Sequence, residues 1–171
     1  AREREPLVLA ARQGLDARGA RLQEPDEGER VALQRTLDMF VVHYDAQGTS
    51  QSCFKVLHDR RGLSVHFMID VDGTSYQTLD LRDTAWHASQ ANTRSVGVEI
   101  AQIGAYPETS SGDKKLSAWY DDNGESVRLV LPDAPKKLGV LTPAFEGRPA
   151  RASKVVGEVQ GEVLQQYDYT P

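Results

Sequence analysis

The sequence predicts an α/β fold with a central mixed β-sheet flanked by helices. Short apolar runs rich in β-branched residues indicate buried strands, and a segment with helical spacing separates the first two. An Asp-Gly turn at residues 72–73 predicts a hairpin. Strands separated by a helix, together with a hairpin, favour a sheet that mixes parallel and antiparallel pairs. The expected strands are residues 39–42, 64–69, 74–79 and 95–100.

Two segments near these strands carry helix signals. Residues 29–38 predict a short helix after an N-terminal arm. A second helix is expected to begin at Ser50, a residue type favoured at the N-cap, and to end before Gly62, where a C-cap glycine belongs. Cys53 has helical spacing with its apolar neighbours, so we expect it to be a core thiol.

Residues 106–152 differ in composition from the rest of the chain, because five of the eight prolines lie there. Prolines at this density indicate loops. Turn residues at 121–125 lie between two strand-like segments and predict an inserted β-hairpin over 117–131. Residues 154–166 alternate in part and predict one further strand. Thr170-Pro171 has the pattern of a helix start.

These patterns give an expected domain organisation. We expect an N-terminal arm and short helix over residues 1–37, followed by one domain over 38–171. That domain contains the insertion at 106–152. The helix start at its end favours a chain that lacks its C-terminal portion.

Composition limits the classes of function. The chain has 171 residues, a formal net charge of -5 and one cysteine. The acidic balance argues against nucleic-acid binding. No apolar run approaches the roughly 18 residues that a membrane helix needs, so we expect no membrane span. A single cysteine excludes an internal disulfide and a multi-cysteine zinc site.

His43 and Glu99 are the first candidates for chemistry. His43 ends an apolar strand and begins a polar loop, which suits a metal ligand or an acid–base group, although a histidine there is often structural. Glu99 lies near the end of a strand that should be buried. Because burying an unpaired carboxylate is costly, Glu99 lines a site or forms an ion pair, for which Arg94 is the candidate partner.

Trp86-His87 precedes the strand of Glu99, and His66 lies inside an earlier strand. An aromatic side chain beside a histidine suits a wall that binds sugar or peptide, and it equally suits a hydrophobic plug with a polar tip. For His66 we expect a structural role, with a buried hydrogen bond that ties the sheet to a loop.

Several motifs follow one another without a long gap. They are Phe40-Val41-Val42-His43-Tyr44, residues 64–74, Tyr76-Gln77, Ala85-Trp86-His87-Ala88, Asn92 and residues 95–99. In this order, over about residues 38–104, the chain resembles the zinc-dependent N-acetylmuramoyl-L-alanine amidases of the type 2 amidase and peptidoglycan-recognition-protein superfamily. The resemblance implies an α/β fold with zinc in a surface groove. It also implies hydrolysis of the amide between N-acetylmuramic acid and the L-alanine of the stem peptide.

The same resemblance implies roles for individual residues. His43 matches the first zinc ligand and Glu99 matches the general base. Trp86, His87 and Asn92 match the stretch that lines the substrate groove. A zinc ion with three protein ligands and an open position lowers the pKa of its bound water to about 7, and a nearby carboxylate can take the proton.

The chain departs from the family at the remaining zinc ligands, which are a second histidine and an aspartate or cysteine. His87 is the last histidine, and no Asp-Pro-Gly occurs. Three accounts are open. A C-terminal fragment or partner chain completes the zinc site, or the chain is a non-catalytic peptidoglycan-binding module. In the third account it is a structural or interaction subunit that uses the hairpin as its contact surface.

The resemblance also suggests where the protein acts and on what. Its substrate is expected to be peptidoglycan or a muropeptide. Family membership favours the cell envelope, periplasmic or extracellular, and cell wall degradation as the process, although some relatives are cytoplasmic or phage-borne.

Overall fold

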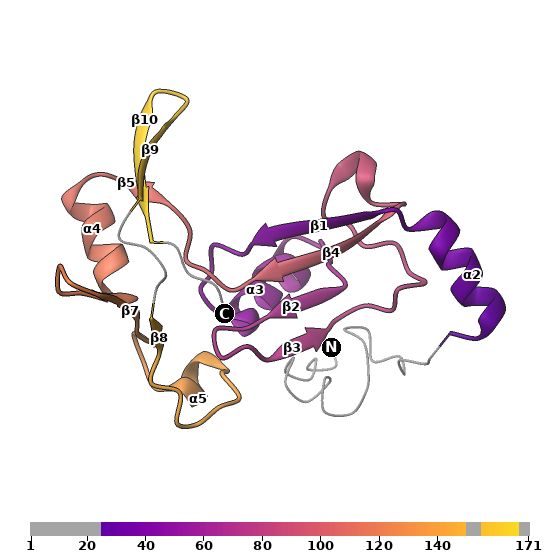
Figure 1. The fold of residues 1–171 in the computed structure, drawn as a ribbon, viewed down its shortest axis with the longest axis horizontal. Coiled ribbons are helices and arrows are strands. Elements are labelled where there is room, and N and C mark those ends of the chain that lie inside the picture. Colours follow the sequence, from indigo (N-terminus) through magenta and orange to yellow (C-terminus); the bar gives the residue numbers. More distant parts are fainter. Residues whose placement is uncertain (1–24, 150–154, 168–171) are drawn as a thin grey trace.

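The computed structural model describes residues 25–149 and 155–167, and its main feature is a four-stranded sheet (Figure 1). The strands are β1 (Met39–Tyr44), β2 (Phe67–Ile69), β3 (Ser75–Gln77) and β4 (Ser95–Ile100), in the order β1-β4-β2-β3. β1 and β2 run parallel to β4, and β3 runs antiparallel to β2. The expected α/β class is confirmed.

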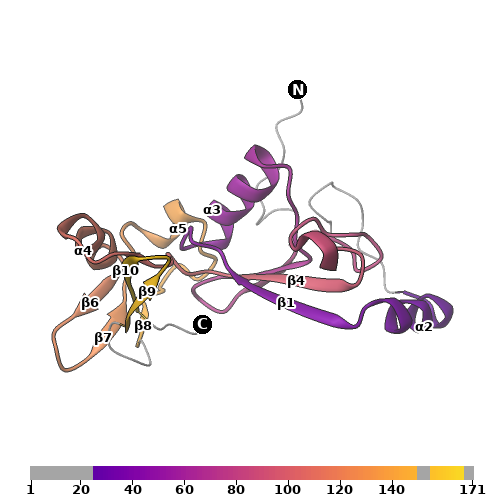
Figure 2. The same cartoon turned by 90° about the horizontal axis from the view of Figure 1, so that it is seen from above.

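Helix α3 (Ser50–Phe54) continues into a π-helical segment, η1 (Lys55–Arg60), and lies against one face of the sheet (Figure 2). The predicted N-cap was wrong by one residue. Thr49 caps the helix, since its hydroxyl accepts from the backbone N–H of Ser52. The N–H of Ser50 instead donates to Asp70 Oδ1 at 3.1 Å. Gly62 has φ +64°, as expected of a glycine just beyond a helix end.

A first hydrophobic core lies between this helix and the sheet. Its buried members are Cys53, Phe54, Val65, Met68 and Tyr76. Cys53 is 1% exposed and has a free thiol, so the prediction of a core thiol is confirmed. This core packs the helix against the sheet.

Helix α2 (Glu27–Thr36) lies beyond the start of β1 (Figure 2). It begins two residues before the predicted segment, because Asp26 and Glu29 form a capping box. Asp26 Oδ1 accepts from the N–H of Glu29 at 2.8 Å, and Glu29 Oε2 accepts from the N–H of Asp26 at 2.9 Å. Over the described ranges, no helix is both long and apolar enough to cross a membrane.

The second half of the described chain forms two small three-stranded sheets and two helices. Its elements are β5 (Tyr106–Pro107), α4 (Ser110–Ser117), β6 (Tyr120–Asp122), β7 (Val127–Leu129), α5 (Pro135–Leu138), β8 (Arg148–Pro149), β9 (Val155–Val159) and β10 (Glu162–Gln166). β6 and β7 pair antiparallel within the predicted hairpin segment. The single strand predicted over 154–166 was wrong, because Gln160 and Gly161 turn the chain between β9 and β10. Neither helix was predicted.

A second hydrophobic core joins this half to the sheet. Its buried members are Val71, Ala101, Ile103, Leu116, Tyr120, Val127, Leu129, Val140 and Tyr167. The first three come from segments that leave the four-stranded sheet. The second half is therefore packed on the end of the sheet by a shared core.

Candidate functional site

His43 and Glu99 lie opposite each other on paired strands. β1 and β4 are parallel, with His43 in register with Glu99. Residues opposite each other on neighbouring strands point to the same face, so both side chains lie on one face of the sheet. Together with Asp45 and Arg61 they line a pocket of about 260 Å³ beside η1. The structure therefore brings the two main predicted residues together.

Glu99 is a buried carboxylate in this pocket. Its side chain is 8% exposed, and its Oε2 has no hydrogen-bond partner within the described ranges. Burial raises the pKa of Glu99 to about 7, the Asp45 carboxylate adds to the rise, and Arg61 opposes it. The alternative ion pair with Arg94 was wrong, because Arg94 pairs with Asp38.

Asp45 is a pocket residue that the sequence analysis missed. Its Oδ1 accepts backbone N–H groups from Gln47, Gly48 and Gln102 at 2.9–3.1 Å. Burial raises its pKa to about 7 despite these bonds. The available signal was its position, since it follows the strand of His43 directly and begins the polar loop.

His43 meets His87 at the edge of the same site. The two side chains approach through His43 Nε2 and His87 Nδ1, which are 3.0 Å apart, and the rings are nearly perpendicular. Burial lowers the pKa of both histidines. For His87 the pKa falls to about 4, with His43 and His66 adding to the effect of burial. Both rings are therefore neutral near pH 7, which is the state that binds metal ions.

Asn92 and Ser64 hold the segment that carries Trp86 and His87. Asn92 is 8% exposed, and its Oδ1 accepts the N–H groups of His87 at 3.0 Å and Ala88 at 2.7 Å. Ser64 binds Trp86 in both directions, with Ser64 Oγ accepting from the Trp86 N–H and the Trp86 carbonyl accepting from the Ser64 N–H. These contacts fix the backbone and leave the indole 61% exposed.

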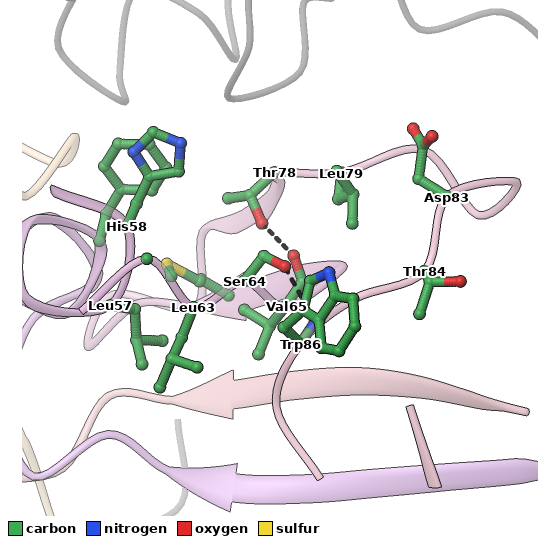
Figure 3. Close-up of a pocket in the computed structure, with 13 residues that line it drawn as sticks. Leu57, His58, Leu63, Ser64, Val65, Thr78, Leu79, Asp83, Thr84 and Trp86 are labelled. Carbon is green, nitrogen blue, oxygen red and sulfur yellow. Dashed lines mark hydrogen bonds between the residues drawn. The ribbon is translucent and has the colours of Figure 1, made fainter. Parts of the chain in front are cut away.

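Trp86 lines a different pocket from His43 and Glu99. This second pocket has a volume of about 410 Å³ and lies between η1 and the loop that follows β3. Figure 3 shows the indole between Val65 and Thr84, with Leu57 and Leu63 nearby. Leu57 lines both pockets, so η1 separates a polar pocket from a more apolar one.

His66 has the structural role that was predicted. It is 1% exposed, its Nε2 donates to the carbonyl of Asp83 at 3.1 Å, and its Nδ1 accepts from the N–H of Gly97 at 3.1 Å. These two bonds fix its tautomer and tie the loop of Asp83 to β4. The predicted link between sheet and loop is confirmed.

The donor set of the site falls short of a catalytic metal centre. In the part of the chain that the structure describes, no three His, Cys, Asp or Glu side chains are grouped to hold a metal ion. His43 and His87 supply two imidazole nitrogens, whereas catalytic zinc sites take three protein ligands. The described residues thus do not form a complete zinc site.

Fold and site together define an α/β protein with a buried carboxylate and a pair of histidines beside one pocket. The family model for N-acetylmuramoyl-L-alanine amidase matches residues 33–130, more than half of the chain, and the chain belongs to this family. These are hydrolases of peptidoglycan, generally zinc-dependent. A search of curated proteins found no match.

Proposed function

We propose that the chain hydrolyses the amide between N-acetylmuramic acid and L-alanine in peptidoglycan or muropeptides, with Glu99 as general base. One observation carries the proposal: a buried carboxylate lies opposite His43 at the wall of an open pocket, and one of its oxygens has no hydrogen-bond partner among the described residues. Burying a carboxylate without full hydrogen bonding is costly, so its presence at a pocket wall favours a chemical role.

In this proposal Glu99 acts twice. Its Oε2 takes a proton from the attacking water as the oxygen bonds to the amide carbonyl carbon. It then returns that proton to the nitrogen of L-alanine as the carbon–nitrogen bond breaks. The products are a free muramic acid carboxyl group and a free stem peptide, and Glu99 is regenerated.

His43 is proposed as a zinc ligand. The family is generally zinc-dependent, and a zinc ion held in part by His43 would supply Lewis-acid chemistry. Further ligands would come from outside the described ranges, from a C-terminal segment or a partner chain.

The apolar pocket beside η1 is proposed to bind the substrate. The exposed indole of Trp86 offers a flat face to sugar or peptide groups. Asn92 holds the backbone of His87, the residue that follows Trp86, and so helps to position the indole. The cell envelope, periplasmic or extracellular, is proposed as the location, because a peptidoglycan substrate lies there.

The proposal is tested by Glu99→Gln on purified muropeptides, with release of the stem peptide measured by chromatography. The change keeps the shape of the side chain and removes the base. We expect turnover to fall by about 10²–10⁴-fold while the fold is retained. Glu125→Gln is the matched control, because Glu125 is exposed in the β6–β7 turn. Full activity of Glu99→Gln would refute the general-base role.

A second function is favoured by the incomplete donor set. The described residues bring together two histidine nitrogens, and a catalytic zinc site needs three protein ligands. On this ground the chain would act as a peptidoglycan-binding module without catalysis. In that case the wild-type chain sediments with insoluble peptidoglycan but releases no stem peptide, even with added zinc. An interaction subunit that uses the β6–β7 hairpin would show neither property.

A further inference from the structure

A further hollow lies between helix α2 and the loop that follows β3. The residues that line it come from within 29–37, 81–84 and 92–95. Its volume is about 290 Å³. That is close to the lower end of the roughly 300–1,000 Å³ that ligand pockets have, so it suits one small group. We refer to it as the α2 hollow.

Helix α2 turns leucines toward this hollow. Leu33 and Leu37 line it, while each of the ten residues of the helix is at least partly exposed. Helices of globular proteins are held mainly by packing of an apolar face. One contact that holds α2 in place is instead the ion pair of Glu29 with Arg82, at 3.2 Å. The two leucines therefore form an apolar wall that a ligand can cover.

Asn92 supplies a hydrogen-bond donor at the facing wall. Its Oδ1 accepts from the N–H groups of His87 and Ala88, and two donors facing one atom identify that atom as the oxygen. The side chain is 8% exposed, and its Nδ2 donates to no other residue within the described ranges. Leaving a nearly buried donor unmatched is costly, so a ligand oxygen beside Asn92 is favoured.

The remaining polar groups of the wall suit a neutral ligand. Arg82 already pairs with Glu29 and Asp80, and Asp83 has a partner of its own. The Thr36 hydroxyl donates to the helix backbone at 2.9 Å, which leaves its oxygen free to accept. A donor, an acceptor and an apolar wall around a small space match an N-acetylated sugar, which has hydroxyl groups, an amide and a methyl group.

The α2 hollow adjoins the site of the proposed reaction. Asp83 and Thr84 line both this hollow and the pocket of Trp86, and Figure 3 shows them on the loop beyond the indole. At its other side the hollow is lined by Ser95, four residues before Glu99 on β4. At a rise of about 3.3 Å per residue this is roughly 13 Å along the strand. One glycan strand can therefore reach both places.

We propose that the α2 hollow binds one N-acetylhexosamine unit of a glycan strand whose muramic acid lies at Glu99. The acetyl methyl group covers Leu33 and Leu37, and a sugar oxygen accepts from Asn92 Nδ2. This inference rests on the proposed function for the identity of the strand. It gives the chain a preference for polymeric peptidoglycan over muropeptides that carry a single sugar.

The test is calorimetric titration of the full chain with a tetrasaccharide of N-acetylglucosamine, which carries no stem peptide. Leu33→Trp fills the hollow and should lower the affinity by roughly tenfold or more. Val31→Trp is the matched control and should bind as the wild type does, because Val31 lies on the same helix, is 37% exposed and does not line the hollow. Thr36→Val keeps the shape of the side chain and removes the acceptor, so we expect about a fivefold loss. Circular dichroism checks the fold, and Thr36→Val decides the question if Leu33→Trp does not fold.

Two results would overturn the inference: no binding of the tetrasaccharide by the wild-type chain, or wild-type affinity in a folded Leu33→Trp protein. Binding that survives Leu33→Trp and is lost in Trp86→Ala would place the sugar in the Trp86 pocket and would also overturn it. The readout does not depend on hydrolysis. A chain that binds the tetrasaccharide through the hollow but releases no stem peptide would refute the proposed function and leave this inference intact. A chain that hydrolyses muropeptides without binding the tetrasaccharide would do the reverse.

Discussion

The sheet with its loops and the second half of the chain bury different kinds of side chain. The buried polar residues of the first region include Glu99, His66, Asp70 and Ser95, whereas the second region, within the described ranges, buries one, Gln165. Its core is otherwise built from residues such as Leu116 and Leu129. Buried polar groups cost stability unless fully bonded. The contrast indicates that the buried polar groups of the site lower the stability of the sheet region, while the apolar core of the second region contributes stability.

Leu129→Ala sharpens this contrast with the largest expected change in stability. Leu129 is 2% exposed in the second core. Its truncation leaves a cavity and should lower the free energy of unfolding by about 2–5 kcal/mol. Urea unfolding measures the loss.

The same variant should keep wild-type turnover per folded molecule, because Leu129 touches neither pocket. Glu99→Gln is its counterpart, with turnover lost and stability retained. A Leu129→Ala protein that is folded but slow on muropeptides would break the division between the two regions.

Asp70→Asn tests the cost of burial in the sheet region. Asp70 is 0% exposed, its Oδ1 accepts from Ser50 and Val71, and burial raises its pKa to about 6, with Asp72 adding to the rise. Between about pH 4 and 6 the folded state therefore holds a proton that the unfolded state has lost. As the pH rises through this range, the titration of Asp70 lowers the free energy of unfolding of the wild type by an amount on the order of 2 kcal/mol.

Asparagine keeps the accepting oxygen and has no charge to bury. The free energy of unfolding of the variant, relative to that of the wild type, should therefore be higher at pH 7 than at pH 4. Urea unfolding of both proteins at both pH values measures it. The difference between the two proteins cancels the contribution of Glu99, and it includes the effect of the Asp70 charge on Asp45, whose pKa that charge raises. An equal difference at both pH values would show that Asp70 carries no such cost.

The sequence predicted the parts of the fold that depend on local pattern. β4 was predicted with its observed bounds, and β1 was predicted except for its last two residues, because both are short apolar runs. Helix α4 was missed because only Gly112 and Leu116 of its eight residues are buried, which leaves almost no apolar periodicity. The turn at Gln160-Gly161 was missed because glutamine is unusual at a positive φ.

The candidate site divides in the same way. His43 and Glu99 were found because polar residues at the ends of apolar strands are visible in sequence. The contacts of His87 with Ser95 and Gly97 were not, because they exist only once the loop that carries His87 folds over β4. A separation of eight residues between His87 and Ser95 gives no sequence signal that the two side chains are in contact.

Tyr167→Phe is the finest test of how the second region is held. The Tyr167 ring lies 4.6 Å from the ring of Tyr120, and its hydroxyl donates to Asp122 Oδ2 at 2.7 Å. Phenylalanine keeps the ring contact and removes the hydroxyl, so the variant should lose about 1–2 kcal/mol of unfolding free energy. Thermal unfolding measures this, with Tyr106→Phe as the control. If the contact between the Tyr167 and Tyr120 rings holds the second region together, the loss of unfolding free energy stays small. A loss comparable to that of Leu129→Ala would show that the second region depends on a buried polar contact, as the sheet region does.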